Sequence, residues 1–236
     1  MKNLLVFFLF YNMFFSLLLS QKYCTKTGLE RITGIKDGYR YELWNQYGQG
    51  VACMTVDSGA LFSGVWNGIH NYLARRGLEF DTTRIPEEIG TFVAKYNCNY
   101  NPESKSGLSY LAVYGWTINP LVEYYIVEDW RNWIPSMAPG SKFKGTIKVD
   151  GSIYDIYENI RIKQPSILGD TTFVQYFSIR RDTRNSGIIS ITEHFKKWQS
   201  LNMPMGYLFE VSFVVEGYES NGSFKFNQLE IYITKK

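Results

Sequence analysis

The sequence is poor in histidine, cysteine and charge of one sign, and each shortage excludes a class of site. Only two histidines, His70 and His194, occur in 236 residues, which excludes a histidine-rich metal centre. The spacings of its three cysteines match no zinc pattern. The formal net charge is only +3, and no run of Lys and Arg forms a nucleic-acid-binding motif. We therefore expect neither a metal site nor a nucleic-acid partner.

Aromatic residues, by contrast, are abundant: the chain contains 18 Tyr, 16 Phe and 6 Trp. Together with 45% apolar residues, they are typical of one globular domain with a large core. Tyr and Trp favour β-strands, and their flat rings can stack on sugar rings. The composition therefore points towards a β-rich protein that handles carbohydrate.

The first 20 residues differ from the rest of the chain. Lys2 is their only charged residue, and it precedes an apolar run from Leu4 to Leu19. This pattern predicts a secretory signal peptide over residues 1–20, and hence a secreted, extracellular protein without a membrane contact after cleavage. A membrane anchor is the alternative, but the run is shorter than the roughly 20 residues that span a bilayer. We expect a leader over residues 21–37 and a single domain over residues 38–236.

Three cysteines follow the predicted signal peptide, which is an odd number for a secreted protein. Cys24, Cys53 and Cys98 allow one disulfide and one free thiol, and the sequence leaves the pairing open. The apolar stretch around Cys53 favours a buried structural cysteine at that position.

Short strands separated by Gly or Pro dominate the remaining sequence. The alternation predicts strands at Tyr39–Trp44, Gly50–Val56, Leu61–Trp66, Ser109–Gly115, Val122–Val127, Lys142–Val149, Ser152–Ile162, Thr172–Arg180, Leu208–Gly217 and Phe224–Ile233. Residues 192–203 are the exception, because Phe195 and Trp198 share a helical face there. Thr192 could cap this helix, and Pro204 follows it. One helix among many strands predicts an all-β fold, with a sandwich of two antiparallel sheets as the default.

Two glutamates on distant strands each lie beside a tyrosine on the same strand face. Because residues two apart share a face, Glu123 points the same way as Tyr125, and Glu216 the same way as Tyr218. A glycosidase needs two carboxyl groups across the scissile bond, one ionised and one kept protonated by a raised pKa. The alternation fits equally well two exposed glutamates on amphipathic strands, so spacing alone leaves both readings open.

Two further features fit a sugar-binding cleft. Tyr110, Tyr114 and Trp116 share one strand face and could line such a cleft, although a core between two sheets would use the same pattern. The stretch 161–170 contains Pro and Gly between two strands, which predicts either a mobile lid or a surface turn.

Several blocks of the sequence resemble the family 11 glycoside hydrolases, which are secreted endo-1,4-β-xylanases. In chain order they are Tyr39–Trp44, Trp66–Tyr72, Tyr114–Trp116, Asn119–Glu128, Tyr154–Tyr157, Gln164–Ile167, Gln175–Arg180, His194–Trp198 and Val215–Tyr218. The resemblance runs from residue 38 to about residue 225. It implies a β-jelly roll of two twisted antiparallel sheets that form a cleft, with a single α-helix packed on one sheet.

The resemblance also implies roles for individual residues. Glu123 matches the nucleophile and Glu216 the proton donor of a retaining double displacement. Together with the aromatic row, the substrate-binding positions are Trp44, Asn71, Tyr110, Tyr114, Trp116, Tyr125, Arg161, Pro165, Ser166, Ile167, Gln175 and Tyr218. Asn71 occupies a position where family members with Asp work in acid and those with Asn work nearer neutral pH. We therefore expect a near-neutral pH optimum.

Three segments depart from the family pattern. Phe177 replaces a usual tryptophan, which we expect to alter packing behind the cleft. Residues 219–223 add a carboxylate and create a glycosylation sequon at Asn221. Residues 224–236 match poorly, and we expect an altered last strand there.

These observations lead to one expected function and two alternatives. We expect a monomer that hydrolyses internal β-1,4 bonds of xylan and xylo-oligosaccharides without a cofactor. The first alternative is an inactive carbohydrate-binding jelly roll that keeps the cleft aromatics but lacks one carboxylate. The second is a β-glucanase on a related fold, which would select hexose rather than pentose units. His70 is expected at the cleft rim or in the core and His194 on the helix, with neither acting as a catalytic base.

Overall fold

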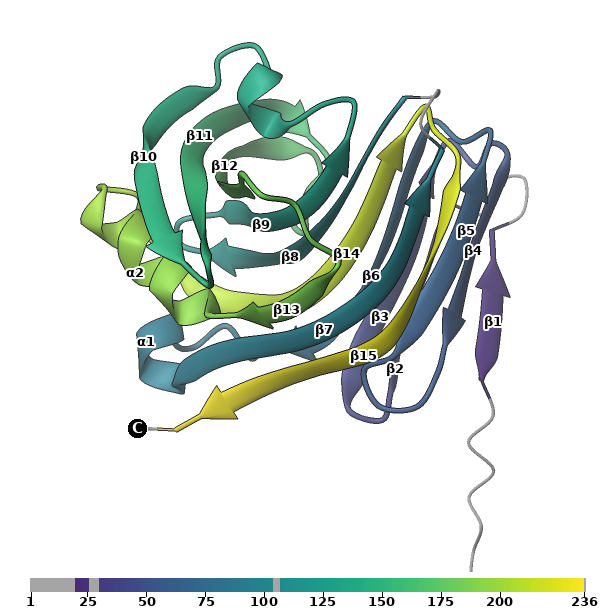
Figure 1. The fold of residues 1–236 in the computed structure, drawn as a ribbon, viewed down its shortest axis with the longest axis horizontal. Helices are drawn as coiled ribbons and strands as arrows, with labels where there is room; N and C mark the ends of the chain where they lie inside the picture. The colour runs from purple at the N-terminus through teal and green to yellow at the C-terminus, as the bar shows by residue number, and fades with distance from the viewer. Residues whose placement is uncertain (1–19, 26–29, 104–106, 236) are drawn as a thin grey trace, which may run out of the picture.

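Two curved β-sheets, one of six strands and one of nine, account for most of the protein (Figure 1). The computed structural model describes residues 20–25, 30–103 and 107–235. Except for Ser20, the predicted signal peptide over residues 1–20 lies outside the described residues. Within the part of the chain that is described, no helix is both long and apolar enough to cross a bilayer.

The strand order places sequence-distant segments side by side. The smaller sheet has the order β1 (Gln21–Cys24), β4 (Val51–Val56), β5 (Phe62–Asn67), β15 (Gly222–Thr234), β7 (Thr91–Pro102) and β13 (Ser186–Ile189). The larger has the order β10 (Lys142–Val149), β11 (Ser152–Gln164), β12 (Thr171–Arg180), β9 (Val122–Arg131), β8 (Leu108–Ile118), β14 (Tyr207–Tyr218), β6 (Asn71–Glu79), β3 (Tyr39–Gln46) and β2 (Arg31–Lys36). The expected all-β jelly roll is confirmed, although β9 and β12 pair in parallel.

The helical segments among the described residues are few and short. They are α1 (Pro86–Ile89), a single 3₁₀ turn over Pro135–Met137 and α2 (Ile191–Ser200). Of these, α2 is the helix that the sequence predicts, and it lies beside β7 and β10 (Figure 1). Its Phe195 and Trp198 are fully buried, as their shared face predicts.

The start of α2 differs from the prediction. Ser190 occupies the N-cap position, and Thr192 lies inside the first turn. The Thr192 hydroxyl accepts a hydrogen bond from the Phe92 amide at 2.7 Å, so it ties the helix to β7 instead of capping it. His194 lies on the buried side of α2, where burial lowers its pKa to about 3 and keeps the imidazole neutral.

Residues of the predicted leader form edge strands. Strand β1 pairs with β4 in the smaller sheet, and β2 pairs with β3 in the larger one. The sequence patterns also missed β6 and β7, which both lie inside the sheets, and the edge strand β13. In β7 the alternation is regular, but its exposed positions carry residues such as Asn97 and Asn99, and asparagine disfavours strands.

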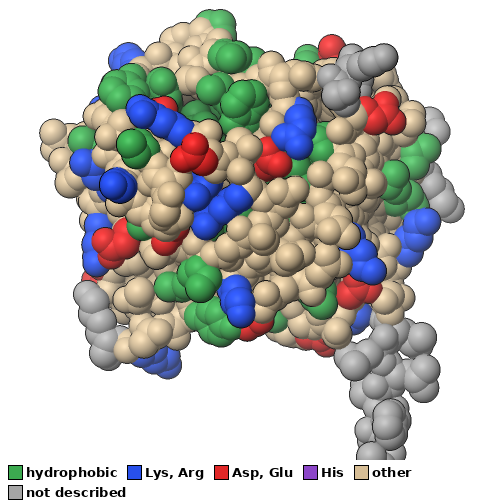
Figure 2. Space-filling view, viewed as in Figure 1, with side chains coloured by type: hydrophobic (Ala, Val, Ile, Leu, Met, Phe, Trp, Pro, Cys, Tyr) green, Lys and Arg blue, Asp and Glu red, His purple; other side chains and the backbone are tan. Residues whose placement is uncertain are grey.

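Most of the buried apolar side chains form one core between the two sheets. This core includes Trp66, Phe213, Phe226 and the helix residue Trp198, all almost inaccessible to solvent. The C-terminal segment, which matches the family pattern poorly, also contributes side chains to this core. Its strand β15 pairs with β5 on one side and along the whole of β7 on the other. On the face shown in Figure 2, basic and acidic side chains are interspersed, so their fields largely cancel there.

A disulfide joins Cys24 of β1 to Cys53 of β4, and Cys98 is a buried free thiol. Cys53 is therefore buried, as its apolar surroundings predict, but as one half of a bridge. The bridge closes a loop with a sequence separation of 29 residues. Among the described strands, the edge strand β1 has β4 as its single neighbour in the sheet. The bridge adds a covalent link between these two strands.

Removal of this bridge is expected to destabilise the protein. A Cys24→Ser/Cys53→Ser variant should lose about 2–4 kcal/mol of unfolding free energy, because the unfolded chain regains the entropy of the open loop. Urea denaturation with and without a reductant measures the effect. Reductant should lower the stability of the wild type and leave the double variant unchanged. Equal stability of oxidised wild type and double variant would contradict the prediction.

Candidate active site

The face of the larger sheet that is turned away from the smaller sheet carries an aromatic cluster of its own. Tyr110, Tyr114 and Trp116 of β8 are packed there with Tyr125 of β9 and Phe177 of β12, separately from the core between the sheets. The reading of this aromatic row as a core between sheets is therefore wrong. These rings are buried but form one wall of a cleft.

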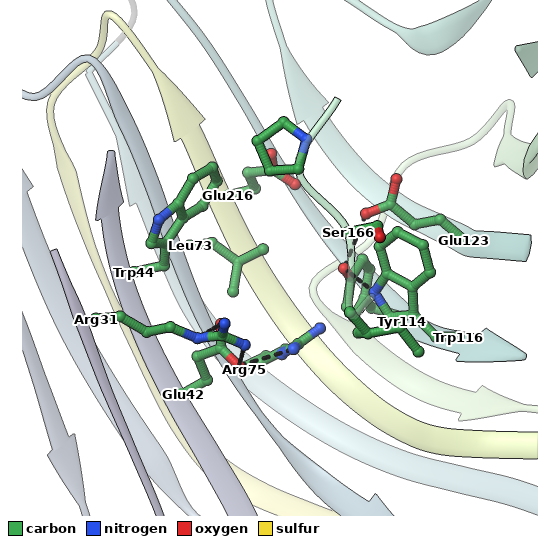
Figure 3. A pocket seen from close by; sticks show the side chains of 12 residues that line it. Arg31, Glu42, Trp44, Leu73, Arg75, Tyr114, Trp116, Glu123, Ser166 and Glu216 are labelled. Carbon is green, nitrogen blue, oxygen red and sulfur yellow. Dashed lines mark hydrogen bonds and ion pairs between the residues drawn. The ribbon is translucent and has the colours of Figure 1, made fainter. Parts of the chain in front are cut away.

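The cleft contains every site residue that the sequence predicts. Figure 3 shows part of it, with Glu123 and Glu216 from two different strands facing the same hollow. The predicted residues that line it are Trp44, Asn71, Tyr110, Tyr114, Trp116, Glu123, Tyr125, Arg161, Pro165, Ser166, Ile167, Gln175, Glu216 and Tyr218. They come from β3, β6, β8, β9, β11, β12 and β14, and from the turn that joins β11 to β12.

Glu123 is held by three hydrogen-bond donors. The Gln175 amide donates to its Oε2 atom at 2.6 Å, and the Tyr114 and Tyr125 hydroxyls lie 2.8 and 3.1 Å from Oε1. Gln175 reaches it because the parallel pairing of β9 and β12 sets these two residues opposite each other. Glu123 as a whole is only 7% exposed. Such donors stabilise the ionised form of a buried carboxylate.

Glu216 lies on β14 and shares the Tyr125 hydroxyl with Glu123. This hydroxyl is 3.2 Å from Glu216 Oε2 and 3.1 Å from Glu123 Oε1. The two carboxylate oxygens are therefore at most about 6.3 Å apart. Neither glutamate sits on an open solvent face, so the alternative reading of two exposed strand residues is wrong for both.

The surroundings of the two carboxyl groups differ, and they favour different protonation states for Glu123 and Glu216. Burial, followed by the negative charge of Glu123, raises the pKa of Glu216 to about 7. Burial also raises the pKa of Glu123, but the hydrogen bonds from Gln175, Tyr114 and Tyr125 oppose that shift. At neutral pH, one ionised and one protonated carboxyl group can thus face each other across the cleft.

A buried ion-pair network lies along the same cleft as the glutamates and was missed by the sequence analysis. Arg75 of β6 contacts Glu42 at 2.7 Å and Glu210 at 2.6 Å. Its guanidinium also lies 4.9 Å from the ring centre of Tyr114. Burial disfavours ionisation of Glu42, yet Arg75 and Arg31 hold the pKa of Glu42 at about 2. The network therefore fixes the tyrosine that donates to Glu123.

A phase argument could have found two members of this network. Glu210 lies six residues before Glu216 on β14, so both point to the same strand face. Glu42 lies two residues before Trp44 on β3 in the same way. No periodicity indicates that Arg75 lies between the two glutamates, because that contact joins three separate strands.

The stretch 161–170 forms a hairpin tip that hangs over the cleft. The Ser166 hydroxyl donates to the Gly169 carbonyl at 2.6 Å and accepts from the Leu168 amide at 3.0 Å. These bonds shape the tip, and Ile167 packs against the aromatic cluster. Pro165, Ser166 and Ile167 thereby form part of the cleft wall.

Phe177 does not lie behind the cleft as expected. Its ring stacks on Tyr125 with centres 5.1 Å apart and an angle of 18° between the planes. It also lines the cleft. The reason is simple strand geometry, since Phe177 is two residues from Gln175 on β12 and is paired with Tyr125. A substitution at this position therefore acts next to the hydroxyl that joins the two glutamates.

Comparison with known proteins identifies the family. The sequence model of glycosyl hydrolases family 11 matches residues 36–227. The chain belongs to this family. The matched range runs from the end of β2 into β15 and contains all the cleft residues named above.

Individual relatives of this family 11 chain agree with the match. It is 52% identical over 190 residues to an endo-1,4-β-xylanase A of Thermoclostridium stercorarium, covering 80% of this chain but 28% of that protein. It is 49% identical to an endo-1,4-β-xylanase A of Bacillus pumilus, covering 80% of this chain and 79% of the relative. The chain thus spans less than a third of the Thermoclostridium protein and most of the Bacillus one.

Solved structures give the same result. The structure of the family 11 xylanase from Neocallimastix patriciarum matches with a TM-score of 0.82 at 36% sequence identity. The match covers 91% of this chain and 100% of that one. The resemblance seen in the sequence blocks is therefore confirmed at the level of family and fold.

Proposed function

We propose that this protein is an endo-1,4-β-xylanase that hydrolyses internal bonds of xylan with retention of anomeric configuration. The observation that carries the proposal is the Tyr125 hydroxyl within hydrogen-bond distance of both Glu123 and Glu216. Their nearest oxygens are at most about 6.3 Å apart. A separation within this limit is compatible with the roughly 5–5.5 Å between the two catalytic carboxyl groups of retaining enzymes. It is below the roughly 6.5–9.5 Å between those of inverting enzymes.

The first step forms a covalent intermediate. The ionised Glu123 carboxylate attacks the anomeric carbon while Glu216 donates its proton to the leaving glycosidic oxygen. The bond to that oxygen breaks, and the fragment that begins with the leaving sugar departs. The pKa of about 7 suits Glu216 to this role, because the group still carries a proton at near-neutral pH.

The second step releases the retained sugar. The ionised Glu216 now takes a proton from water, and the resulting hydroxide attacks the anomeric carbon. The bond to Glu123 breaks, and both glutamates return to their starting protonation states. Gln175 and Tyr114 favour Glu123 as the leaving carboxylate, because their hydrogen bonds stabilise its negative charge.

Substrate binding is assigned to the aromatic walls and the hairpin tip. Trp44 presents a ring at the cleft surface, and the tip residues Pro165 and Ile167 lie over the hollow. Flat apolar faces of this kind stack on pyranose rings, while hydroxyl and amide groups fix their orientation. Arg161 adds a cationic group beside the same cleft. The substrate class follows from the names of the relatives.

We also assign the protein to the extracellular space as a monomer that needs no cofactor. The apolar N-terminal pattern supports secretion. The Cys24–Cys53 disulfide supports it independently, because such bridges persist mainly in oxidising compartments.

Two substrates and one spectroscopic measurement test the proposal. The protein should release reducing sugars from arabinoxylan and none from a soluble β-glucan, with a rapid fall in viscosity that marks internal cleavage. Proton NMR of the first products should show the β-anomer before mutarotation. Binding to xylan without release would favour the inactive binding protein. Cleavage of β-glucan with equal efficiency would favour the glucanase, and a first-formed α-anomer would refute the retaining mechanism.

The pH dependence provides a separate prediction. Activity requires protonated Glu216, so kcat should fall as the pH rises through about 7, the pKa of that group. Ionised Glu123 sets the acid limb, and the optimum should therefore lie near neutral pH. Initial rates on xylan between acid and alkaline pH test this. A maximum below about pH 4.5, near the usual pKa of glutamate, would contradict it.

Removal of the Gln175 amide should shift only one limb of this profile. A Gln175→Ala variant deprives the Glu123 carboxylate of a 2.6 Å hydrogen bond, so the pKa of Glu123 should rise. A charged hydrogen bond contributes about 1.5–3 kcal/mol, which moves the acid limb up by about 1–2 pH units. Asn159→Ala, in the same cleft but not bonded to Glu123, is the control. An unchanged acid limb in Gln175→Ala would contradict the prediction.

A further inference from the structure

The Tyr125 hydroxyl serves two carboxyl groups at once. It lies 3.1 Å from Glu123 Oε1 and 3.2 Å from Glu216 Oε2. A phenol has a single hydroxyl proton, so it donates to only one of the two carboxyl groups at any moment. Because the two distances are nearly equal, a small tilt of the ring would bring the hydroxyl closer to one group and take it away from the other. The position of this ring therefore decides how the hydrogen bond is shared.

Other rings hold the Tyr125 ring from two sides. On the side of β8, the ring centres of Tyr110 and Tyr114 lie 5.6 and 4.9 Å away, at steep angles of 81° and 67°. On the side of β12, the Phe177 ring lies within 18° of parallel, with the ring centres 5.1 Å apart. Strand β9 lies between β8 and β12 in the sheet, so these contacts come from opposite neighbours. Phe177 therefore blocks a movement of the Tyr125 ring towards β12.

Phe177 is itself fixed in place. It is almost fully buried, and it is paired with Tyr125 on β9 and with Tyr157 on β11. Its ring carries no polar atom, so it cannot donate a hydrogen bond to a carboxyl group. Its influence on the two glutamates must act through the position of Tyr125 or through the exclusion of water.

These two routes predict opposite shifts of the pKa values. Burial raises the pKa of both Glu123 and Glu216, and the hydrogen bonds from Tyr125 lower both. Loss of the Tyr125 bonds should therefore raise both pKa values, whereas entry of water should lower them. An apolar replacement of Phe177 leaves the other titratable and charged groups that act on the two glutamates in place, which are Tyr110 and Tyr114 of β8 and Arg161 of β11.

We propose that Phe177 is a positioning residue, which holds the Tyr125 hydroxyl between Glu123 and Glu216 by stacking on its ring. The assignment rests on the proposed function, because it concerns the two carboxyl groups of that reaction. In the first step the hydroxyl supports the ionised Glu123, and once Glu216 has given up its proton the same hydroxyl can stabilise that group. With the ring held still, this exchange needs only a rotation of the O–H bond.

Replacement of Phe177 by an aliphatic residue tests this role. The kcat/KM on xylan is measured against pH for the wild type, Phe177→Leu and Phe177→Met, because this profile reports the pKa values of the free enzyme. In both variants the acid limb and the alkaline limb should move to higher pH by about 0.5–1 unit, the value of one hydrogen bond on each carboxyl group. Phe177→Trp keeps a flat ring and should leave both limbs where they are. Far-UV circular dichroism of each sample checks folding.

A second background isolates the contribution of the hydroxyl. In Tyr125→Phe the hydroxyl is absent, so Phe177→Leu should cause no further shift of either limb. Phe226→Leu is the control, since it removes a ring stacked on Phe62 at 4.7 Å in the core between the sheets. It should lower the stability and leave both limbs unchanged.

Three outcomes would overturn the role of Phe177. They are limbs that stay in place in the folded Leu and Met variants, limbs that move to lower pH, and an equal shift in the Tyr125→Phe background. A wild type that cleaves no xylan would instead refute the proposed function.

Discussion

Replacement of Glu123 by glutamine is expected to lower kcat on xylan by about 10⁴-fold or more. Glutamine has nearly the same shape, so the buried packing around Tyr114 and Gln175 should persist. The neutral amide of glutamine cannot form the covalent bond to the anomeric carbon. Besides Glu216, the only carboxylate of the described residues that lines the cleft is Glu42, which is paired with Arg75. Far-UV circular dichroism together with reducing-sugar assays measures folding and activity in the same samples.

Azide provides a direct test of which bond Glu123 makes. In Glu123→Ala, azide should enter the vacated space and attack the anomeric carbon of an aryl xylobioside, displacing the phenolate. The product should be the α-glycosyl azide, because one displacement inverts the configuration. Glu158→Gln on β11, two strands away from β9 in the sheet, is the control and should retain activity within about twofold. A Glu123→Gln variant with more than about one hundredth of wild-type activity on xylan would contradict the nucleophile assignment.

Replacement of Glu216 by glutamine should produce a different pattern of loss. On xylan, kcat should fall by about 10²–10⁴-fold, the usual contribution of general acid–base catalysis. On an aryl xylobioside with a good leaving group, the first step needs no protonation. We therefore expect a rapid burst of phenolate followed by slow turnover, as the intermediate on Glu123 accumulates.

The pH profile and azide separate this variant from a misfolded one. The alkaline limb near pH 7 should disappear, because Glu216, the group whose pKa is about 7, has been removed. Azide should accelerate turnover and give the β-glycosyl azide, since two displacements restore the configuration. Glu193→Gln, an exposed glutamate on α2 away from the cleft, should behave like the wild type. An intact alkaline limb in Glu216→Gln would contradict the acid–base assignment.

Alternation along single strands predicted much of the candidate site. The period of two placed Glu123 on the same face as Tyr125, and Tyr110 on the same face as Tyr114 and Trp116, because side-chain direction is a local property of an extended backbone. It failed where no alternation was visible. In β6, residues 72–77 are all buried and include Arg75 as well as apolar side chains, so no alternation marks one face.

The same local rule could not say what each face meets. From the sequence, Phe177 is expected behind the cleft, but the parallel register of β9 and β12 sets its ring on Tyr125 and thus in the cleft. The Cys24–Cys53 pairing likewise depends on the antiparallel contact of β1 with β4. Such contacts join residues that are far apart in the sequence, and their pairing is set by the energy of the whole sheet.

The sequence by itself determined the all-β class, the helix around Phe195 and Trp198, and the identity of the cleft residues. Local periodicity and motif blocks carry that information. Only the tertiary structure decided that the Tyr125 hydroxyl reaches both Glu123 and Glu216, and that burial raises the pKa of Glu216 to about 7. Hydrogen-bond distance and desolvation are properties of three-dimensional neighbours, and these neighbours come together only when β8, β9, β12 and β14 pair in one sheet.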